Sequence, residues 1–300
     1  MGGVSSERDI SLISGEKVAK HVPRNKYQVS VYDPKFDLFK LISDFKKRKI
    51  DVVFPVLHGK YGEDGCIQGL LETFHVPYVG PRVFASSLCM HKEKTKLVAS
   101  AYGILTPKYK IYQRGDAIKL SEIKLPAVIK PIDSGSSVGI SIPENRKQLR
   151  RGLKKAFLES SLVMIEDFIK GREFTVGVIG NKKNVTVLPI SEIVPLLSKF
   201  YDYKAKYAVG GSLHTCPAKI SKTLSEKIKA LAKRIYWIVE AQGMSRIDFM
   251  YSTRNKKIYF IEVNTIPGMT DVSLLPEAAK AAGISFSQLL DKLITYSLPK

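Results

Sequence analysis

Residues 246–270 read RIDFMYSTRNKKIYFIEVNTIPGMT, a pattern that predicts a β-hairpin. Alternate residues of a strand point to the same face, so Arg246 shares a face with Asp248. On the second strand, Glu262 shares a face with Asn264. The opposite face is apolar and consists of Ile247, Phe249, Ile261 and Val263. The hairpin therefore combines two carboxylates, an amide and a guanidinium with a face that can join a core.

The register of this hairpin decides whether its polar residues meet. We expect Ser252 to pair with Ile258 across the polar turn. That register places Asp248 opposite Glu262, whereas a shift of one residue would separate them. Magnesium takes one or two protein carboxylates and completes its shell with water and phosphates, so Asp248, Glu262 and Asn264 are candidate metal ligands. The alternative is an exposed polar strand face without a ligand.

The composition is that of a globular protein with more than one domain. The chain has 300 residues, of which 44% are hydrophobic and 25% charged, and this length favours two or three domains. No apolar run approaches the roughly 20 residues that cross a membrane, and the N-terminus lacks the pattern of a signal peptide. Cys66, Cys89 and Cys216 lack the paired spacing of disulfides or a structural zinc site. We therefore expect a cytoplasmic protein with reduced thiols and no membrane partner.

The formal net charge of +20, from 48 Lys and Arg against 28 Asp and Glu, raises the question of nucleic-acid binding. The basic residues are spread over predicted helix faces at 45–49, 146–155 and 219–234, with few interleaved aromatic residues and no nucleic-acid motif. We therefore expect solvated surfaces and no nucleic-acid partner. A positive field also favours an anionic small substrate such as a nucleotide.

The first third of the chain alternates between helical and strand patterns. The expected elements are a helix at 11–22, a strand at 27–32, a helix at 36–47 and a strand at 52–57. This order predicts a parallel sheet, with the loops 2–7 and 58–65 at the carboxyl ends of its strands. A glycine loop such as 2–7 should follow a strand, so the first strand is missing from this pattern. We expect an apolar β-strand upstream of Gly2.

The segment 126–142 reads PAVIKPIDSGSSVGISI and predicts a strand, a loop of small residues and a second strand. Lys130 ends the first strand. The loop 134–137 offers N–H groups and hydroxyls that can approach a phosphate closely. In isolation such a turn is more often a plain hairpin, and the lysine is what favours a phosphate site.

A helix at 144–158 and a strand at 162–166 are expected next. Glu166 and Glu173 flank the turn at Gly171. Carboxylates at such a place can accept hydrogen bonds from an adenine amino group or ribose hydroxyls, and surface salt bridges are the alternative. Further along, the aperiodic segment 200–217 is typical of a lid over a site. Helical patterns follow at 221–240 and, twice, within 271–298.

Together these loops resemble the D-alanine:D-alanine ligase family of the ATP-grasp fold. The matching stretches occur in family order over essentially the whole chain, at 2–15, 57–69, 128–139, 165–176, 200–207, 243–250 and 260–276. The resemblance implies an α/β chain with an N-terminal Rossmann-like substrate domain at 1–84, a central ATP-grasp subdomain at 85–170 and a C-terminal catalytic subdomain at 171–300. The chain departs from the family pattern at His91, Asp167 and Lys204.

For the nucleotide, the resemblance implies three phosphate-binding lysines, Lys92, Lys130 and Lys206. It implies that the loop containing Ser137 folds over the phosphates. The residues near adenine and ribose would be Glu166, Ile169 and Glu173. Two Mg²⁺ or Mn²⁺ ions would be bound by Asp248, Glu262 and Asn264.

For the amino acids, the resemblance implies that Glu7 holds the ammonium group of the first D-alanine and is linked to Ser136 and Tyr207. His58 would lie near the same amino acid. Arg246 and the Gly268 N–H would stabilise an oxyanion. Ser273 and the Leu274 backbone would bind the carboxylate of the second D-alanine.

The activity that the resemblance implies is ATP-dependent joining of two D-alanines through an acyl phosphate, for peptidoglycan precursors. The partners would then be ATP and D-alanine, and a homodimer is left open. One alternative is a related ligase that accepts D-lactate or D-serine second. Another is a nucleotide-binding protein with a degenerate site, which the retained Arg246 and metal ligands disfavour.

Overall fold

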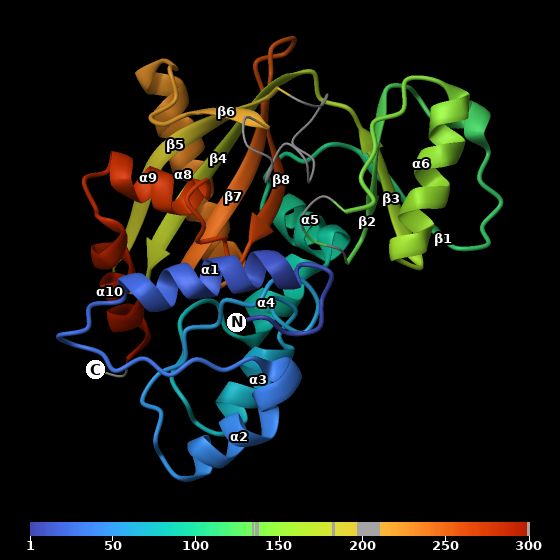
Figure 1. Ribbon diagram of the computed structural model, residues 1–300. Coiled ribbons are helices and arrows are strands. Elements are labelled where there is room, and N and C mark those ends of the chain that lie inside the picture. The colour runs from blue at the N-terminus through green and yellow to red at the C-terminus, as the bar shows by residue number, and fades with distance from the viewer. Residues whose placement is uncertain (134, 136–137, 182–183, 197–210, 299–300) are drawn as a thin grey trace.

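The centre of the molecule is a five-stranded antiparallel sheet in the order β6-β5-β4-β7-β8. The computed structural model describes residues 1–300 except 134, 136–137, 182–183, 197–210 and 299–300. The strands are β4 (Gly171–Gly180), β5 (Val185–Pro195), β6 (Ser212–Thr215), β7 (Gly243–Ser252) and β8 (Ile258–Asn264). The predicted hairpin at 246–270 thus forms one edge of this sheet (Figure 1).

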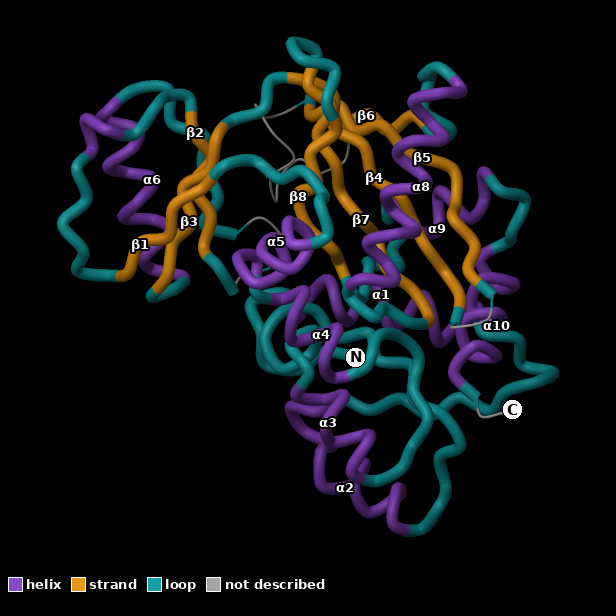
Figure 2. The backbone as a smooth tube through the Cα atoms, turned by 180° about the vertical axis from the view of Figure 1, so that it is seen from behind, coloured by secondary structure: helices purple, strands orange, loops and turns teal. Residues whose placement is uncertain are grey.

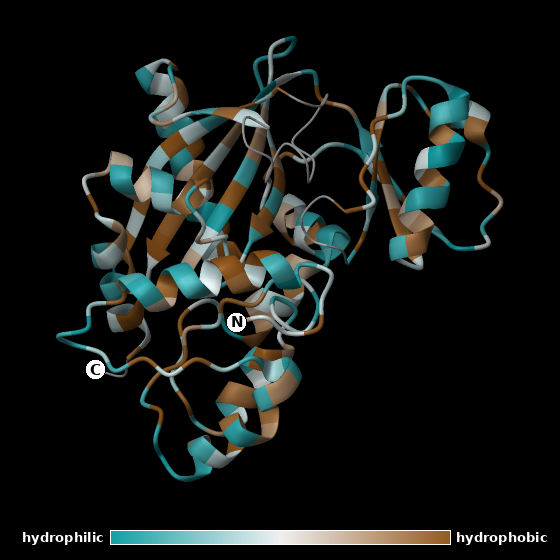
Figure 3. Cartoon of the chain, in the orientation of Figure 1, coloured by the Kyte–Doolittle hydropathy of each residue, from teal (hydrophilic) through white to brown (hydrophobic). Residues whose placement is uncertain are grey.

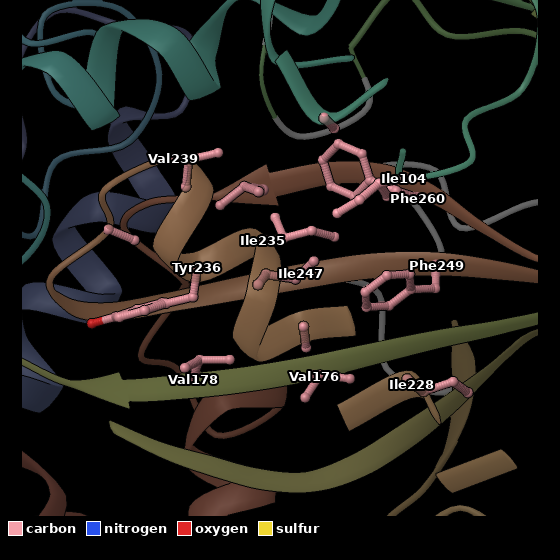
Figure 4. Close-up of a cluster of buried hydrophobic side chains, with 14 of the residues drawn as sticks. Ile104, Val176, Val178, Ile228, Ile235, Tyr236, Val239, Ile247, Phe249 and Phe260 are labelled. Atoms are coloured by element: carbon pink, nitrogen blue, oxygen red, sulfur yellow. The ribbon is translucent and has the colours of Figure 1, made fainter. Parts of the chain in front are cut away.

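Helices cover both faces of the central sheet. The long helix α8 (Lys222–Ile238) packs on one face, where buried side chains of β4, β7 and α8 form a common core (Figure 4). On the other face lie α9 (Leu274–Ala281) and α10 (Phe286–Ser297). A side chain at Gly177 would come within 2.6 Å of Leu275, so this glycine allows α9 to approach β4 closely. The helices predicted at 221–240 and within 271–298 are confirmed.

A second, smaller sheet has the antiparallel order β1-β3-β2. Its elements are β1 (Tyr109–Gln113), the 3₁₀ turn η1 (Leu120–Glu122), β2 (Ala127–Pro131), the covering helix α6 (Arg146–Glu159) and β3 (Leu162–Asp167). The helix and strands expected here are confirmed, except that the second strand of 126–142 is reduced to one bridge between Ile129 and Ser141. In Figures 1 and 2 this sheet stands to one side of the central sheet, and α5 (Lys92–Ala101) lies between them.

The N-terminal region contains the helices predicted at 11–22 and 36–47 but not the predicted strands. The helices of this region are α1 (Arg8–His21), α2 (Pro34–Lys46), α3 (Cys66–Thr73) and α4 (Val83–Met90), of which α1 and α2 are the predicted ones. Residues 27–32 and 52–57 are extended, yet the one parallel pairing in the described part of the chain is a bridge between Val53 and Tyr78. The prediction of two strands of a parallel sheet at 27–32 and 52–57 is therefore wrong.

A cavity of about 770 Å³ explains the absence of a ladder between these two segments. Val29 and Val31 line it from one segment, and Val52 and Val56 line it from the other. Because sheet hydrogen bonds need strands about 4.8 Å apart, segments on opposite sides of a cavity cannot pair.

Steric constraints explain why glycine occupies two positions in the loop at the start of the chain. Gly2 and Gly3 have φ values of +84° and +80°, and a side chain on Gly2 would lie 2.6 Å from the Asp33 carboxylate. Asp33 accepts a hydrogen bond from the Gly3 N–H at 2.9 Å and pairs with Arg8 at 2.5 Å. The loop is thereby tied to the residue that precedes α2.

Hydropathy differs between the central strands and the helices that cover them. Figure 3 shows hydrophobic residues concentrated on the central strands and hydrophilic residues on helices such as α1 and α6. None of the helices in the described ranges has the length and apolar character needed to cross a membrane.

Candidate active site

Strands β7 and β8 bring the polar hairpin residues together as predicted. Asp248 pairs with Glu262, and Arg246 pairs with Asn264. On the other side of β7, Thr175 of β4 pairs with Asp248 and donates a hydrogen bond to Asp248 Oδ1 at 2.5 Å. The site is therefore built on three adjacent strands of a buried sheet, which keeps these side chains in place.

A β-bulge in β8 sets this register. The predicted pair of Ser252 and Ile258 is wrong, because Tyr251 pairs with Ile258. The bulge leaves Ile261 without a paired residue on β7. It shifts the pairing by one residue, so that Asp248 pairs with Glu262 as predicted. Phe260, at 1% exposure, enters the core in place of the expected Ile261.

The Arg246 guanidinium is fixed along the strand by Asp248. Nε donates to Oδ1 at 3.1 Å and Nη2 donates to Oδ2 at 3.0 Å. Both side chains are nearly buried. Such a bidentate pair holds the charge of Arg246 in one orientation at the site.

The residues at the hairpin fit magnesium if a nucleotide supplies further ligands. Within the residues that the structure describes, no group of three or more His, Cys, Asp or Glu side chains could hold a metal alone. Asp248 and Glu262 provide two carboxylates, and the buried Asn264 amide has a nitrogen without a hydrogen-bond partner among described groups. An amide can present its oxygen to a cation. Two carboxylates and an amide match the protein share of a magnesium shell that phosphates complete.

A buried cluster of charges lies between α5 and the smaller sheet. Glu166 of β3 forms ion pairs with Lys130 of β2 through Oε1 and with Lys96 of α5 through Oε2, the latter at 3.0 Å. Burial would raise the pKa of Glu166, but Lys130 and Lys96 outweigh it and lower the pKa below its usual value. Burial lowers the pKa of Lys130, but Glu166 and then Glu262 outweigh it and raise the pKa. The lysine cluster therefore lies within electrostatic reach of Glu262 on the hairpin.

Three other residues of the predicted nucleotide site lie on neighbouring segments. Lys92 is buried at the start of α5. Its backbone N–H donates a hydrogen bond to the carbonyl of Ile132, just after β2, at 3.2 Å. Glu173 on β4 contributes to the raised pKa of Lys130. Ile169 lies in the segment that joins β3 to β4.

Glu7 lies where three segments meet. Side-chain atoms placed on Gly59 and Gly135 would come within 2.5 and 2.6 Å of Glu7 Oε2. Ser5 donates a hydrogen bond to the His58 carbonyl at 2.7 Å. The structure thus brings Glu7, the loop that starts at His58 and the described glycine of the 134–137 loop together. The other predicted residues Ser136, Ser137, Lys206 and Tyr207 lie outside the described residues.

His58 is held as a neutral imidazole. It hydrogen-bonds the Ile266 backbone, and burial lowers its pKa to about 4. Its Nε2 is buried and has no hydrogen-bond partner among the described groups. At neutral pH this nitrogen can serve a bound ligand as a hydrogen-bonding atom.

Glu63 is a site residue that the sequence reasoning missed. It accepts the Gly59 N–H at 2.7 Å, and burial together with the nearby Glu7 raises its pKa to about 8. Two carboxyl groups that share a buried place cannot both ionise easily, so one retains a proton at neutral pH. The only signal in the sequence was its place in the HGKYGEDG loop between two glycines.

The turn after β8 brings Gly268, Ser273 and Leu274 together. Ser273 Oγ accepts the Thr270 N–H at 2.9 Å, and a side chain on Gly268 would lie 2.8 Å from this Oγ. Leu274 begins α9, so its N–H is one of those without a partner inside the helix. Ser14 of α1 accepts the N–H of Met269 at 3.3 Å, which ties this turn to the N-terminal region.

Comparison with known proteins agrees with this geometry. The family models described as D-ala D-ala ligase N-terminus and D-ala D-ala ligase C-terminus match residues 33–81 and 97–295. The chain belongs to the D-alanine:D-alanine ligase family. A D-alanine–D-alanine ligase of Carboxydothermus hydrogenoformans is 42% identical to it over 99% of this chain and 96% of the relative.

Solved ligases have the same fold over nearly the whole chain. The D-alanine–D-alanine ligase of Bacillus anthracis complexed with ATP has a TM-score of 0.83 and 32% identity, with 99% of this chain and 95% of that chain covered. The VanG D-Ala:D-Ser ligase of Enterococcus faecalis has a TM-score of 0.81 and 32% identity, with coverage of 99% and 98%. The architecture is therefore the ATP-grasp fold of these ligases, as the sequence predicted.

Proposed function

We propose that this chain joins two D-alanine molecules to D-alanyl-D-alanine at the expense of ATP, for the synthesis of peptidoglycan precursors. The observation that supports this most strongly is the register of β7 and β8, which places Asp248 opposite Glu262 with the fixed Arg246 guanidinium on the same face. A carboxylate pair suited to magnesium then lies beside a donor for an oxyanion, and Glu262 acts on the charge of the buried Lys130 in the smaller sheet. That arrangement suits the transfer of a phosphoryl group.

The nucleotide site in this proposal uses buried positive charge. Lys92 and Lys130 bind ATP phosphates, together with Lys206 and the loop that contains Ser137. Glu166, Ile169 and Glu173 border the adenine and ribose. Asp248, Glu262 and Asn264 hold Mg²⁺ or Mn²⁺, which when bound neutralises charge on the phosphate oxygens.

The first D-alanine lies against Glu7 in this proposal. The Glu7 carboxylate attracts its ammonium group, with Ser136 and Tyr207 as further partners, and the neutral His58 borders the same amino acid. The carboxylate of this D-alanine attacks the γ-phosphorus of ATP and forms an acyl phosphate. Because acyl phosphates hydrolyse in water, the pocket must exclude solvent, which the burial of Glu7 and His58 favours.

The second D-alanine completes the reaction. Its amine attacks the acyl phosphate, and the negative charge that develops on the carbonyl oxygen is stabilised by Arg246 and the Gly268 N–H. Ser273 and the Leu274 N–H bind its carboxylate at the start of α9. The fixed orientation of Arg246 on Asp248 supports this role, since a donor that is already oriented needs no rearrangement during the reaction.

A D-Ala:D-Ser or D-lactate ligase is the second candidate, because the VanG D-Ala:D-Ser ligase has the same fold over 99% of this chain. Phosphate release from ATP with a panel of D- and L-amino acids and D-lactate tests both. We expect D-alanine alone to give the highest kcat/KM. Higher kcat/KM with D-serine or D-lactate as second substrate would favour the alternative, and no release with any of them would favour a degenerate nucleotide-binding protein.

We also propose that the chain is a cytoplasmic homodimer. Phe36 and Phe39 on α2 are 71% and 87% exposed, and large apolar side chains so exposed favour a protein contact. Sedimentation equilibrium at micromolar concentration tests this, and a monomer across that range would contradict it.

A further inference from the structure

Lys96 has no part in the proposed reaction, yet it is more deeply buried than either phosphate-binding lysine that the structure describes. Its residue exposure is 1%, against 9% for Lys92 and 5% for Lys130. It lies one helical turn after Lys92 on α5 and points to the same carboxylate as Lys130. A buried ammonium group is costly, so its position needs an explanation.

A gain in folding stability from the contact between Lys96 and Glu166 does not account for the burial of Lys96. Their charged atoms lie 3.0 Å apart, but neither Lys96 Nζ nor Glu166 Oε2 makes an aligned hydrogen bond to any described group. Replacing a buried ion pair by apolar groups is often neutral or stabilising. The burial of Lys96 therefore points to the charge that it adds beside Lys130.

We infer that Lys96 is a positioning residue that keeps Lys130 available for ATP phosphates by occupying one oxygen of Glu166. This inference rests on the proposed role of Lys130 in binding ATP. When both lysines are protonated, Lys96 and Lys130 carry two positive charges against the one negative charge of Glu166; burial lowers the pKa of Lys96, and the adjacent Glu166 raises it. The three groups together keep one net positive charge at the place where Lys130 meets the triphosphate.

Without Lys96, the balance of charge at this place changes. Glu166 would then neutralise Lys130 completely, and both carboxylate oxygens could turn to that single ammonium group. Glu262 and Glu173 already add negative charge near Lys130. A triphosphate would have to compete with Glu166 for Lys130, which lowers its affinity.

The test compares ATP binding in variants of the full chain. Lys96→Met keeps the length and most of the volume of the side chain and removes its charge. We expect the Kd for ATP, measured by calorimetry without amino-acid substrate, to rise by about tenfold or more. We expect the KM for D-alanine to change little. Lys94→Met is the matched control, because Lys94 lies on the same helix with its side chain 56% exposed.

A double variant separates charge from structure. Glu166→Gln removes the negative charge that Lys96 balances, so we expect Lys96→Met to weaken ATP binding much less in the Glu166→Gln background than in the wild type. A role of Lys96 in merely holding α5 in place predicts the same loss in both backgrounds. An ATP affinity for Lys96→Met within twofold of the Lys94→Met control, or an equal loss in the two backgrounds, would overturn the inference.

Lys130→Met distinguishes this inference from the proposed function. If Lys130→Met weakens ATP binding and Lys96→Met does not, the inference about Lys96 fails while the ATP site stands. If Lys130→Met leaves ATP binding unchanged, the assignment of Lys130 itself fails, and the inference falls with it.

Discussion

Arg246 and Asp248 lie two residues apart on one face of β7, and the guanidinium donates to both oxygens of the carboxylate, at 3.1 and 3.0 Å. The carboxylate that is a candidate metal ligand therefore also orients the candidate oxyanion donor. Asp248 therefore links phosphoryl transfer to the attack of the second amine. A change at Asp248 alters both the neutralisation of phosphate charge and the position of Arg246. The strand keeps this coupling rigid.

Arg246→Lys tests the orientation of the charge. Lysine keeps the positive charge but cannot make two parallel bonds to one carboxylate. We expect kcat to fall by about 10² to 10³ with little change in ATP affinity, in line with the loss of one oxyanion donor. Arg254→Lys in the exposed hairpin turn is the control. A kcat for Arg246→Lys equal to that of this control would contradict the assignment.

Glu262→Gln tests the metal site. The change keeps the size of the side chain and removes the charge opposite Asp248. We expect an intact fold, loss of phosphate release by about a hundredfold or more, and a higher Mg²⁺ concentration for half-maximal activity. Glu226→Gln on the exposed face of α8 is the control. An unchanged kcat at saturating magnesium would show that Glu262 is not a ligand.

Gly268→Ala tests the spacing of the turn after β8. The added methyl group would lie 2.8 Å from Ser273 Oγ, so the hydroxyl must move. We expect a higher KM for the second D-alanine and an almost unchanged KM for ATP. Gly69→Ala on α3 is the control, since a methyl group there meets nothing within 4 Å. Equal effects on both KM values would point to a general disturbance instead of a substrate contact.

Glu63→Gln tests the protonated carboxyl group. The pKa of Glu63 is raised to about 8 in the folded protein, so the folded state holds a proton that the unfolded chain has lost above pH 4.5. The stability that this proton gives is complete below about pH 4.5 and is lost as the pH rises towards 8. Glutamine does not titrate, so the free energy of unfolding of the wild type should fall relative to that of the variant over this range.

Urea unfolding at pH 5, 6, 7 and 8 measures this difference. The maximum slope for one proton is about 1.4 kcal/mol per pH unit. Titration of His58 is common to both proteins and cancels in the comparison. Glu16→Gln on the exposed face of α1 should show no such slope. A difference between Glu63→Gln and wild type that stays constant with pH would mean that Glu63 is ionised throughout.

The alternation of residues in 246–270 was enough to predict the face that carries Asp248 and Glu262. Helix patterns such as 144–158 and 221–240 were equally readable, because a helix needs only a local apolar period and its caps. The pattern at 52–57 was apolar enough for a strand, but a strand also needs a partner, and a cavity lies where the partner of this segment would be. The apolar period of a segment predicts which of its faces is buried. It does not predict which other segment forms hydrogen bonds with it.

By itself, the sequence determined the helices, the hairpin and the polar face of the candidate site, because these depend on residues close together in the chain. Only the tertiary structure decided that Lys96 and Glu166, which are 70 residues apart, would share a buried ion pair. It also decided that Glu63 would keep a proton beside Glu7. The charge state of a buried group depends on the solvent it loses and the charges it meets, and packing between distant segments determines both.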